Sequence, residues 1–485
     1  MKDWKAILRL MGLLMMAEGI IMALCGGSVW AVFGEGGGKE MMLCGGGLIA
    51  VGGTLGWGMR KFRTIEEKRM SYVLVVGIWL VMGLAGSLPF LATGATPSVT
   101  NAIFEAMSGI TSTGATIFSD IEVLPKGILL WRSALQWTGG FGIMLLVLAI
   151  VPRLGINKYS LYTAEASRAD NTSKTLSSTG KTVRQTLSVY VGLTIGFVVV
   201  LMLTGMNWWP ALNLTMCNIS SGGFSIYNDS IAGLTPVQQY VLAGEMLLSG
   251  INFTLLYLIV TFQWDRIRNK LDQFSFYIGL AAISIIWVGT MLHLENGYAW
   301  NDALRYGTVQ SLSVLTTTGS VVADTTGWWI PISFWFLMLM MCGGMAGSTT
   351  GGLKAMRILI LWRNVKGVLL NRLHPRAYNP VRLNGHPINE DIIRNVMVLL
   401  VITLLVLICG TAGLMLCGTD ATEALGAITG CLTGYGPGLG KSGGFGSYAE
   451  FGIASKWICT FTMLLGRLEC LTVIVIFMPA FWKKR

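Results

Sequence analysis

Four short polar stretches, each ending in glycine, carry residue types that could bind a cation. Each begins with Thr or Ser and follows Ile or Leu. Uncharged carbonyl and hydroxyl oxygens can replace the hydration shell of a monovalent cation. We number the residues of each stretch one to four and call the stretches turns 1 to 4: Thr111-Ser112-Thr113-Gly114, Ser220-Ser221-Gly222-Gly223, Thr316-Thr317-Thr318-Gly319 and Thr433-Gly434-Tyr435-Gly436.

The turns recur at intervals of roughly 100 residues, about the length that two membrane spans, a half-length helix and a turn require. One such turn alone is more simply explained by close helix packing, which favours small residues in membranes. Four aligned copies favour a cation site instead. Non-helical backbone persists at membrane depth only against protein or a water-filled path, so the turns are expected to share one centre.

Composition excludes an ordinary soluble enzyme. Hydrophobic residues make up 53% of the 485 residues and charged residues 12%, about half the charged fraction of a typical soluble chain. The net charge of +11 comes from short basic stretches between apolar runs, as in cytoplasmic loops, and does not indicate nucleic-acid binding. Nine scattered cysteines and three histidines indicate neither a disulfide framework nor a metal cluster, and no cofactor is expected in this chain.

The elements that must position the turns follow from the apolar runs. A bilayer core of about 30 Å needs about 20 apolar helical residues. The first run, Ile7 to Phe33, is expected to remain on the chain as a membrane anchor. Full spans are predicted at 7–33, 41–60, 70–92, 128–152, 183–205, 236–262, 274–294, 330–362, 395–417 and 456–482. Half-length helices are predicted directly before the turns, at 99–110, 208–219, 304–315 and 421–432.

These elements predict an all-α integral membrane protein. It has four pseudo-symmetric repeats of span, pore helix and span around a central pore, and an extra N-terminal pair of spans. The predicted units are the helix pair at 1–62 and pore repeats at 63–160, 161–272, 273–375 and 376–485. Lys and Arg gather in the stretches at 153–182, 264–272 and 363–394, which places these stretches and both termini on the cytoplasmic side.

The chain resembles the TrkH family of bacterial potassium uptake proteins, within the wider Trk/Ktr/HKT superfamily. The resemblance covers essentially the whole chain, and the extra N-terminal pair favours TrkH over the shorter Ktr-type members. Two turns depart from the family pattern: Ser221-Gly222 stands where relatives often have Asn-Ala, and Thr433-Gly434-Tyr435 where they often have Thr-Asn-Val. The matching stretches are Phe104 to Gly109, Thr113 to Thr116, Trp131-Arg132-Ser133, Gln136-Trp137, Gly250 to Phe253, Gly347 to Gly352 and Gly466 to Glu469.

The resemblance implies potassium uptake through a selectivity filter, with the family's selectivity glycines at Gly114, Gly223, Gly319 and Gly436. It also implies a homodimer in the bacterial inner membrane and a cytosolic nucleotide-binding regulatory ring of the TrkA type. Such a partner would dock on the basic loops, because no nucleotide-binding fingerprint is found in this chain. The residues do not decide between channel-like and ion-coupled transport. A Na⁺-coupled or less selective monovalent cation transporter is the alternative function.

The eighth predicted span is interrupted by a glycine-rich segment, which we call loop 343–352. Each glycine costs a helix about 0.8–1.0 kcal/mol relative to alanine, so a regular helix is not expected there. The resemblance implies a gate beneath the filter; a kink or a phosphate-binding loop are the alternatives, although the Gly-Lys-Ser/Thr ending of the latter is missing. The expected gate residues are Gly343, Gly344, Gly347, Ser348, Thr349, Thr350, Gly351, Gly352 and Arg467.

Three further ionisable residues lie in predicted membrane segments, where charge is costly and is usually paired or functional. Arg467 either pairs with Glu469 or, as the resemblance implies, sets an electrostatic barrier below the filter. Glu105 and Arg132 are predicted to brace the first half-length helix together. An intramembrane enzyme would need a catalytic pair at membrane depth, and no such pair with suitable spacing is found.

Overall fold

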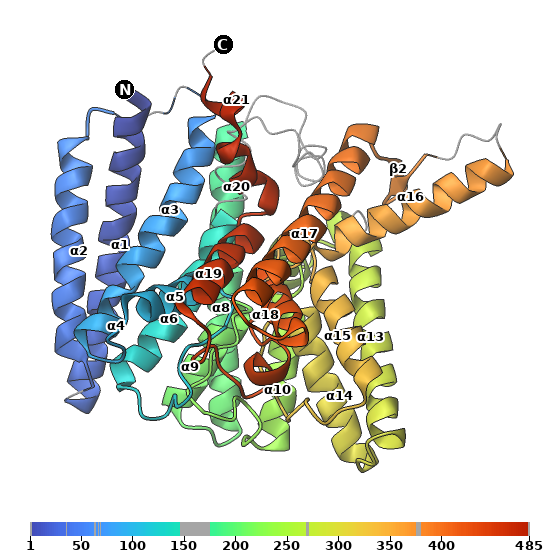
Figure 1. Cartoon of the computed structure of the whole chain (residues 1–485). Helices are drawn as coiled ribbons and strands as arrows, with labels where there is room; N and C mark the ends of the chain where they lie inside the picture. The colour runs from blue at the N-terminus through green and yellow to red at the C-terminus, as the bar shows by residue number, and fades with distance from the viewer. Residues whose placement is uncertain are drawn as a thin grey trace.

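The computed structural model describes residues 2–34, 36–62, 65, 67, 69–145, 175–267, 271–374 and 380–483. The chain is helical throughout most of these residues, apart from one two-stranded hairpin. The basic stretch predicted at 153–182 lies largely outside the described residues, as does the predicted boundary between residues 160 and 161. Helix α1 begins and α21 ends at the same end of the molecule (Figure 1).

The helices of the N-terminal half are α1 (Lys2–Phe33), α2 (Gly38–Gly58), α3 (Met70–Gly86), α4 (Leu88–Ala92), α5 (Val99–Ile110), α6 (Lys126–Leu145), α8 (Thr175–Leu203), α9 (Trp208–Ile219), α10 (Pro236–Ser249), α11 (Phe253–Val260) and α12 (Trp264–Ile267). The rest of the chain forms α13 (Leu271–Leu294), α14 (Trp300–Leu315), α15 (Ile330–Cys342), α16 (Ala355–Leu373), β1 (Arg382–Leu383), β2 (His386–Pro387), α17 (Glu390–Leu416), α18 (Ala421–Thr433), the 3₁₀ helix η5 (Gly440–Ser442), α19 (Ile453–Arg467), α20 (Cys470–Phe477) and α21 (Pro479–Trp482).

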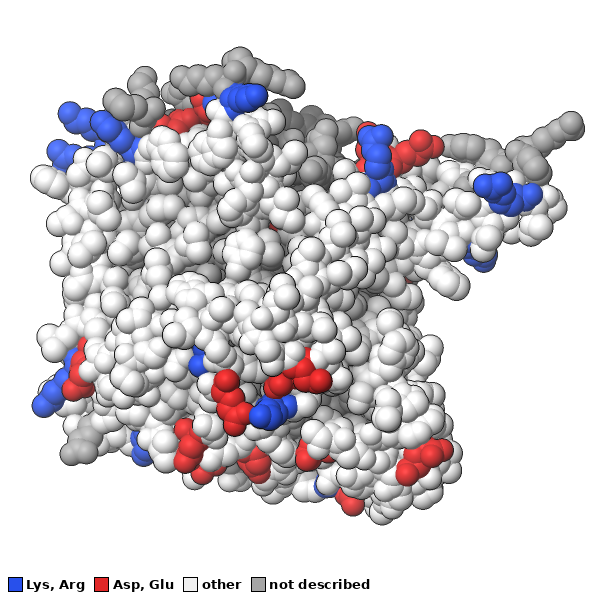
Figure 2. Space-filling model, viewed as in Figure 1, with Lys and Arg blue, Asp and Glu red and all other residues white. Residues whose placement is uncertain are grey.

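Six of the described helices are long and apolar enough to cross a membrane, or up to eight if each of two bent pairs is one span. On the face drawn in Figure 2, charged side chains gather towards the two ends, and a broad uncharged band lies between them. Basic residues predominate at the end where α1 begins, and acidic residues at the other. The all-α membrane fold predicted from the sequence is therefore present.

The sequence predicts single spans at 236–262 and 456–482, but the structure breaks both. Helices α10 and α11 are bent by 105°, and α19 and α20 by 113°. Asn252 starts α11 by accepting a hydrogen bond from the Leu255 N–H (3.1 Å), and Glu469 between α19 and α20 has a left-handed φ of 60°. Local capping and backbone conformation thus end helices that apolar length alone would continue.

The predicted N-terminal pair is present as α1 and α2, which lie side by side at one edge of the molecule (Figure 1). Gly19 and Gly45 face each other across this pair, and a side chain on either would clash with the backbone of the other helix. Small residues let the backbones of membrane helices approach closely. At the opposite edge, α16 projects away from the other helices (Figure 1).

Candidate cation-binding site

Each polar turn directly follows the C-terminal end of a short helix. These helices are α5, α9, α14 and α18, and their bounds agree with the four predicted half-length helices to within a few residues. Unpaired carbonyl groups give the C-terminal end of a helix a partial negative charge. The four turns lie in contact with one another, so the partial charges of four helix ends converge on one place.

The four turns share one backbone conformation. The second position is left-handed in every turn, with φ of 52° at Ser112, 55° at Ser221, 53° at Thr317 and 74° at Gly434. The fourth position is a glycine with φ between 71° and 90°. A left-handed residue that ends a helix in this way is typical of the Schellman motif. The motif's hydrogen bond, from the third-position N–H to the carbonyl five residues earlier, is present as Thr113–Ser108, Gly222–Cys217, Thr318–Ser313 and Tyr435–Gly430 (2.8–2.9 Å).

The first-position hydroxyls brace the helix ends. Each donates a hydrogen bond to the carbonyl four residues earlier in its own helix, so the hydroxyl proton is used inside the repeat. The pairs are Thr111–Met107 (2.6 Å), Ser220–Met216 (2.9 Å), Thr316–Leu312 (2.7 Å) and Thr433–Thr429 (2.8 Å). These hydrogen bonds support a bracing role for the first-position hydroxyls.

The turns close into a ring, which we call the four-turn ring. A Cβ on the fourth-position glycine of each turn would clash with the third-position carbonyl oxygen of the next turn. The pairs are Gly114 with Gly222, Gly223 with Thr318, Gly319 with Tyr435, and Gly436 with Thr113. Any side chain at these glycines would therefore displace a neighbouring carbonyl, which explains on steric grounds why glycine occupies all four positions.

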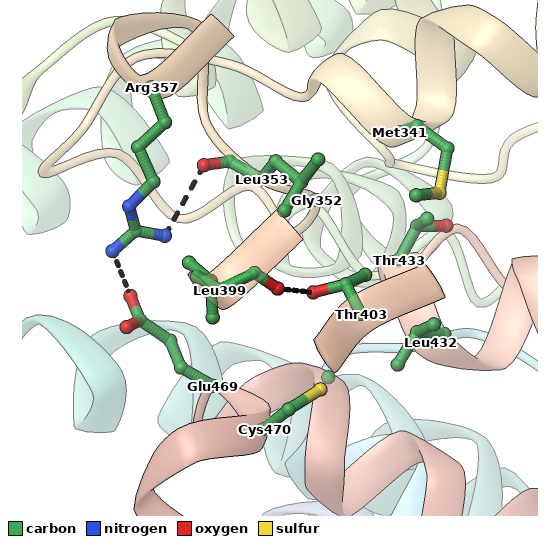
Figure 3. A pocket seen from close by; sticks show the side chains of 11 residues that line it. Met341, Gly352, Leu353, Arg357, Leu399, Thr403, Leu432, Thr433, Glu469 and Cys470 are labelled. Atoms are coloured by element: carbon green, nitrogen blue, oxygen red, sulfur yellow. Dashed lines mark hydrogen bonds and ion pairs between the residues drawn. The ribbon is translucent and has the colours of Figure 1, made fainter. Parts of the chain in front are cut away.

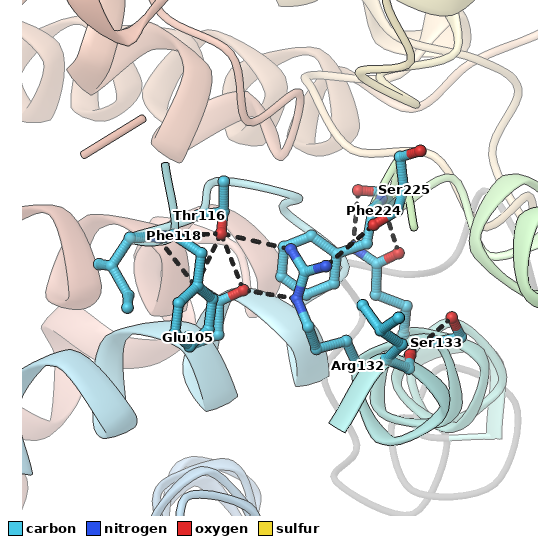
Figure 4. A network of polar contacts seen from close by, with 11 residues as sticks. Glu105, Thr116, Phe118, Arg132, Ser133, Phe224 and Ser225 are labelled. Atoms are coloured by element: carbon cyan, nitrogen blue, oxygen red, sulfur yellow. Dashed lines mark hydrogen bonds and ion pairs between the residues drawn. The ribbon is translucent and has the colours of Figure 1, made fainter. Parts of the chain in front are cut away.

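Buried Glu105 and Arg132 stabilise the backbone that leaves turns 1 and 2 (Figure 4). Their ion pair (Nε–Oε1 2.8 Å) has at most 1% of either side chain exposed, and it confirms the predicted pairing. Glu105 also accepts the Ile117 N–H (2.9 Å), and Arg132 donates to the Ser225 carbonyl (2.9 Å). One ion pair thereby joins two adjacent turns.

Other supports of the ring are not identified by the sequence analysis. Gln136 donates to the Gly222 carbonyl (2.7 Å) and accepts the Phe224 N–H (3.1 Å). Tyr448 donates to the Gly436 carbonyl (2.8 Å), and Gln310 donates to the Tyr435 hydroxyl (2.9 Å). Gln136 and Gln310 are uncharged polar residues within predicted helices, and Gln136 also belongs to a stretch that matches the family, but neither signal specifies a partner. Tyr448 lies in a glycine-rich connection between predicted spans, where the sequence gives no signal for its contact.

Loop 343–352 separates α15 from α16 and lies against the four-turn ring. The Thr349 hydroxyl meets the Ser221 hydroxyl (2.7 Å), the Gly351 N–H donates to the Thr317 hydroxyl (2.7 Å), and the Gly352 N–H donates to the Thr433 carbonyl (2.9 Å). Within the loop, the Thr350 hydroxyl accepts the Gly344 N–H (3.2 Å) and meets the Ser348 hydroxyl (2.7 Å), and Gly343 and Gly347 have positive φ. The break between α10 and α11 also contacts the loop. There the Asn252 side chain donates to the Ala346 carbonyl (2.7 Å), and the Phe253 N–H to the Gly347 carbonyl (3.1 Å).

Arg467 joins the loop to the ring and does not pair with Glu469. Its guanidinium donates to the Thr349 carbonyl (2.9 Å) and the Gly139 carbonyl (3.1 Å), and contacts the Ser112 hydroxyl (3.3 Å). The partner of Glu469 is Arg357 in α16 (2.5 Å). The ion pair considered from the sequence is therefore replaced by a long-range pair, and Arg467 is left to bind carbonyl groups.

A small pocket lies next to the loop, on the side where α16 begins (Figure 3). Gly352 and Thr433 line it together with the Arg357–Glu469 pair. Thr403 also lines it, but its hydroxyl donates to the Leu399 carbonyl of its own helix (2.8 Å). The pocket thus borders the contact between the loop and turn 4.

The class of protein follows from this architecture: a multi-pass membrane protein in which four helix ends and their polar turns surround one centre. The model of the TrkH family, described as "Cation transport protein", matches residues 38–484, and the chain belongs to this family. The family comprises transport proteins and not enzymes.

Relatives and a solved structure agree with this assignment over the whole chain. The chain is 31% identical to the Trk system potassium uptake protein TrkH of Halomonas elongata, over 99% of both chains. It is 30% identical to the protein of the same name from Escherichia coli K12, over 99% of this chain and 100% of that one. The crystal structure of the potassium transporter TrkH from Vibrio parahaemolyticus superimposes with a TM-score of 0.90 at 29% identity, covering 99% of this chain and 100% of that one.

Proposed function

We propose that the chain takes up K⁺ across a bacterial inner membrane through the four-turn ring. The observation that carries the proposal is the closure of four identical turn conformations on one another, with third-position carbonyls at every junction. Carbonyl oxygens without a carboxylate or lysine in the turns suit a desolvated monovalent cation better than Mg²⁺ or Ca²⁺. The potassium uptake function in the names of the relatives supports the same ion.

The test is ion flux through purified protein in proteoliposomes. Uptake of K⁺ and of Na⁺ is measured separately, with and without a proton gradient, against empty vesicles. We expect K⁺ flux to exceed Na⁺ flux. Dependence on the proton or sodium gradient would indicate coupled transport, equal K⁺ and Na⁺ fluxes would contradict selectivity, and absence of any cation flux would overturn the proposal.

We propose further that loop 343–352 and Arg467 gate the path. The loop lies against three of the turns directly, and Arg467 connects it to Ser112 of turn 1. A guanidinium beside a cation path repels the permeating ion. Broken helices recur where membrane transporters bind and gate their substrates. Opening then requires the loop to leave the ring.

Regulation by a cytosolic nucleotide-binding subunit of the TrkA type is part of this proposal. "Trk system" in the names of the relatives supports the presence of further components. We expect such a subunit to dock at the basic end of the molecule (Figure 2). There Asp272 at the start of α13 binds Arg363 of α16 (2.6 Å) and the Asn384 N–H of the β hairpin (2.7 Å), so these three elements are connected. Flux measured with and without a purified TrkA-type subunit and its nucleotide tests this part.

A further inference from the structure

The second-position side chains of turns 1 to 3 contact the loop or its anchor. Ser221 meets the Thr349 hydroxyl (2.7 Å), Thr317 accepts the Gly351 N–H (2.7 Å), and Ser112 contacts Arg467 (3.3 Å). All three second-position residues are buried, with at most 1% of their surface exposed. In turns 1 to 3, the residue with the left-handed φ is therefore also the residue whose side chain makes the hydrogen bond to the loop or to Arg467.

The backbone at this position makes the choice of residue informative. Left-handed φ costs a residue with a Cβ roughly 1–2 kcal/mol, and glycine avoids that cost. Turn 4 has Gly434 there, yet turns 1 to 3 have Ser112, Ser221 and Thr317. Thr is β-branched and therefore especially unfavourable in this conformation. Three strained hydroxyl residues that contact either loop 343–352 or Arg467, which is hydrogen-bonded to that loop, point to a function for their side chains.

We propose that the second-position hydroxyls of turns 1 to 3 form a latch that holds loop 343–352 closed against the four-turn ring. The proposal rests on the gating role proposed above for this loop and assigns the closing contacts to residues of the turns themselves. Because the latch and the ring share one backbone, the stability of the closed gate depends on the conformation of the ion-binding turns. Coupling between the two sites is necessarily reciprocal.

Turn 4 contributes a different contact. Gly434 has no side chain, and the Gly352 N–H donates instead to the backbone carbonyl of Thr433 (2.9 Å). A Cβ on Gly351 would clash with the same carbonyl, so the loop backbone packs directly on this turn. Side-chain substitutions can therefore release turns 1 to 3 selectively while the contact with turn 4 remains.

The experiment measures K⁺ flux per folded protein in proteoliposomes for Ser221→Ala, Thr317→Ala and Thr317→Ser. Losing one buried hydrogen bond of the closed state is expected to increase flux roughly two- to tenfold in each alanine variant. Thr317→Ser keeps the hydroxyl that accepts the Gly351 N–H and is therefore expected to increase flux less than Thr317→Ala does. Thr462→Val removes a buried hydroxyl that binds the Ile458 carbonyl of its own helix (2.8 Å), and is the matched control.

A double-mutant cycle separates the latch from a general loosening of the ring. Ser221→Ala and Thr349→Ala remove the two ends of one hydroxyl contact, so their effects on flux should be clearly less than multiplicative. Multiplicative effects, or unchanged flux in both Ser221→Ala and Thr317→Ala, would overturn the latch. If Arg467→Ala raises flux while both alanine variants do not, the gate proposal survives and the latch alone fails. Absence of K⁺ flux from wild type and all variants would instead refute the proposed function.

Discussion

At the residue scale, the fourth-position glycines are fixed by sterics and not by local flexibility alone. Each must have a positive φ and must also leave room for the carbonyl of the next turn. The two requirements act together, because a Cβ would both strain its own backbone and displace an oxygen of the ring. The first requirement is visible in the sequence, whereas the second depends on contacts between turns that are far apart along the chain.

Replacing Gly114 by serine should therefore lower the preference for K⁺ over Na⁺. The added Cβ meets the Gly222 carbonyl, so one junction of the ring must widen or rotate. Reversal potentials or competitive uptake would measure the change. Gly196→Ser is the control, because a Cβ at Gly196 in α8 meets no other atom within 4 Å. Unchanged selectivity in serine variants of all four ring glycines would contradict the role of the ring.

Arg467 is the second residue-scale test. At about 8 Å and an effective dielectric constant of about 20, its charge would oppose a permeating cation by roughly 2 kcal/mol, equivalent to more than tenfold in rate. Arg467→Ala also removes the hydrogen bond to the Thr349 carbonyl, so both effects should increase K⁺ flux. Arg467→Lys keeps the charge and should change flux less. Reduced flux from well-folded Arg467→Ala protein would contradict the barrier and the gate contact together.

At the scale of elements, the short helices and the interruption of the eighth span at loop 343–352 were predictable, whereas the breaks within the predicted spans 236–262 and 456–482 were not. Thr or Ser followed by glycine marks the C-terminal ends of α5, α9, α14 and α18, and a half-length apolar run fixes their starts. Apolar length, by contrast, predicts a straight span over α10 and α11, whereas the actual break at Asn252 serves contacts with Ala346, which lies far along the chain. Likewise, the partner of Glu469 could not be read from the sequence, because Arg357 approaches it only after α16 is placed.

The contact between loop 343–352 and turn 4 predicts how substitutions and deletions in the loop change K⁺ flux. Gly351→Ala should increase K⁺ flux, because its Cβ clashes with the Thr433 carbonyl and the loop can no longer seat fully on turn 4. Deletion of residues 343–350 should increase flux further. The ranking of K⁺ over Na⁺ should persist, since the ring glycines are unchanged. Gly244→Ala in α10, where a Cβ meets no other atom within 4 Å, is the control, and wild-type flux after the deletion would show that the loop is only a kink.

The Glu105–Arg132 pair supports a prediction about stability. Arg132→Met leaves the fully buried Glu105 carboxylate without its cation and should destabilise the protein by roughly 3–5 kcal/mol. Thermal unfolding in detergent, monitored by size-exclusion chromatography of heated samples, would detect the lost stability as a lower midpoint temperature of unfolding. The Glu105→Gln, Arg132→Met double variant removes the stranded charge and should recover part of the stability. A melting curve of Arg132→Met that matches the wild type would contradict the bracing role.

At the scale of the whole molecule, the distribution of charge and the shared end of α1 and α21 fit one orientation. Figure 2 shows basic residues mainly at the end where α1 begins, and on the positive-inside rule we propose that this end faces the cytoplasm. The sequence predicts the same orientation, because the basic stretches alternate with apolar runs that are long enough to span a membrane. How the described helices pack around the ring was less accessible, since packing depends on glycines such as Gly45 meeting a partner in another helix.

The projecting helix α16 offers a test of the homodimer that the family resemblance implies. Trp362, Val365, Leu369 and Leu373 are each more than half exposed on this helix, and an apolar face that stands away from the body can be covered by a second copy of the chain. We expect a cysteine at Leu369 to form disulfide-linked dimers in membranes under mild oxidation, and a cysteine at the exposed Leu203 on α8 to form few. Quantifying dimer on non-reducing gels, in a background from which the nine native cysteines have been removed, would measure both. Equal cross-linking at the two positions, or a monomer in native mass spectrometry, would exclude α16 as the dimer contact and leave its apolar face to the lipid.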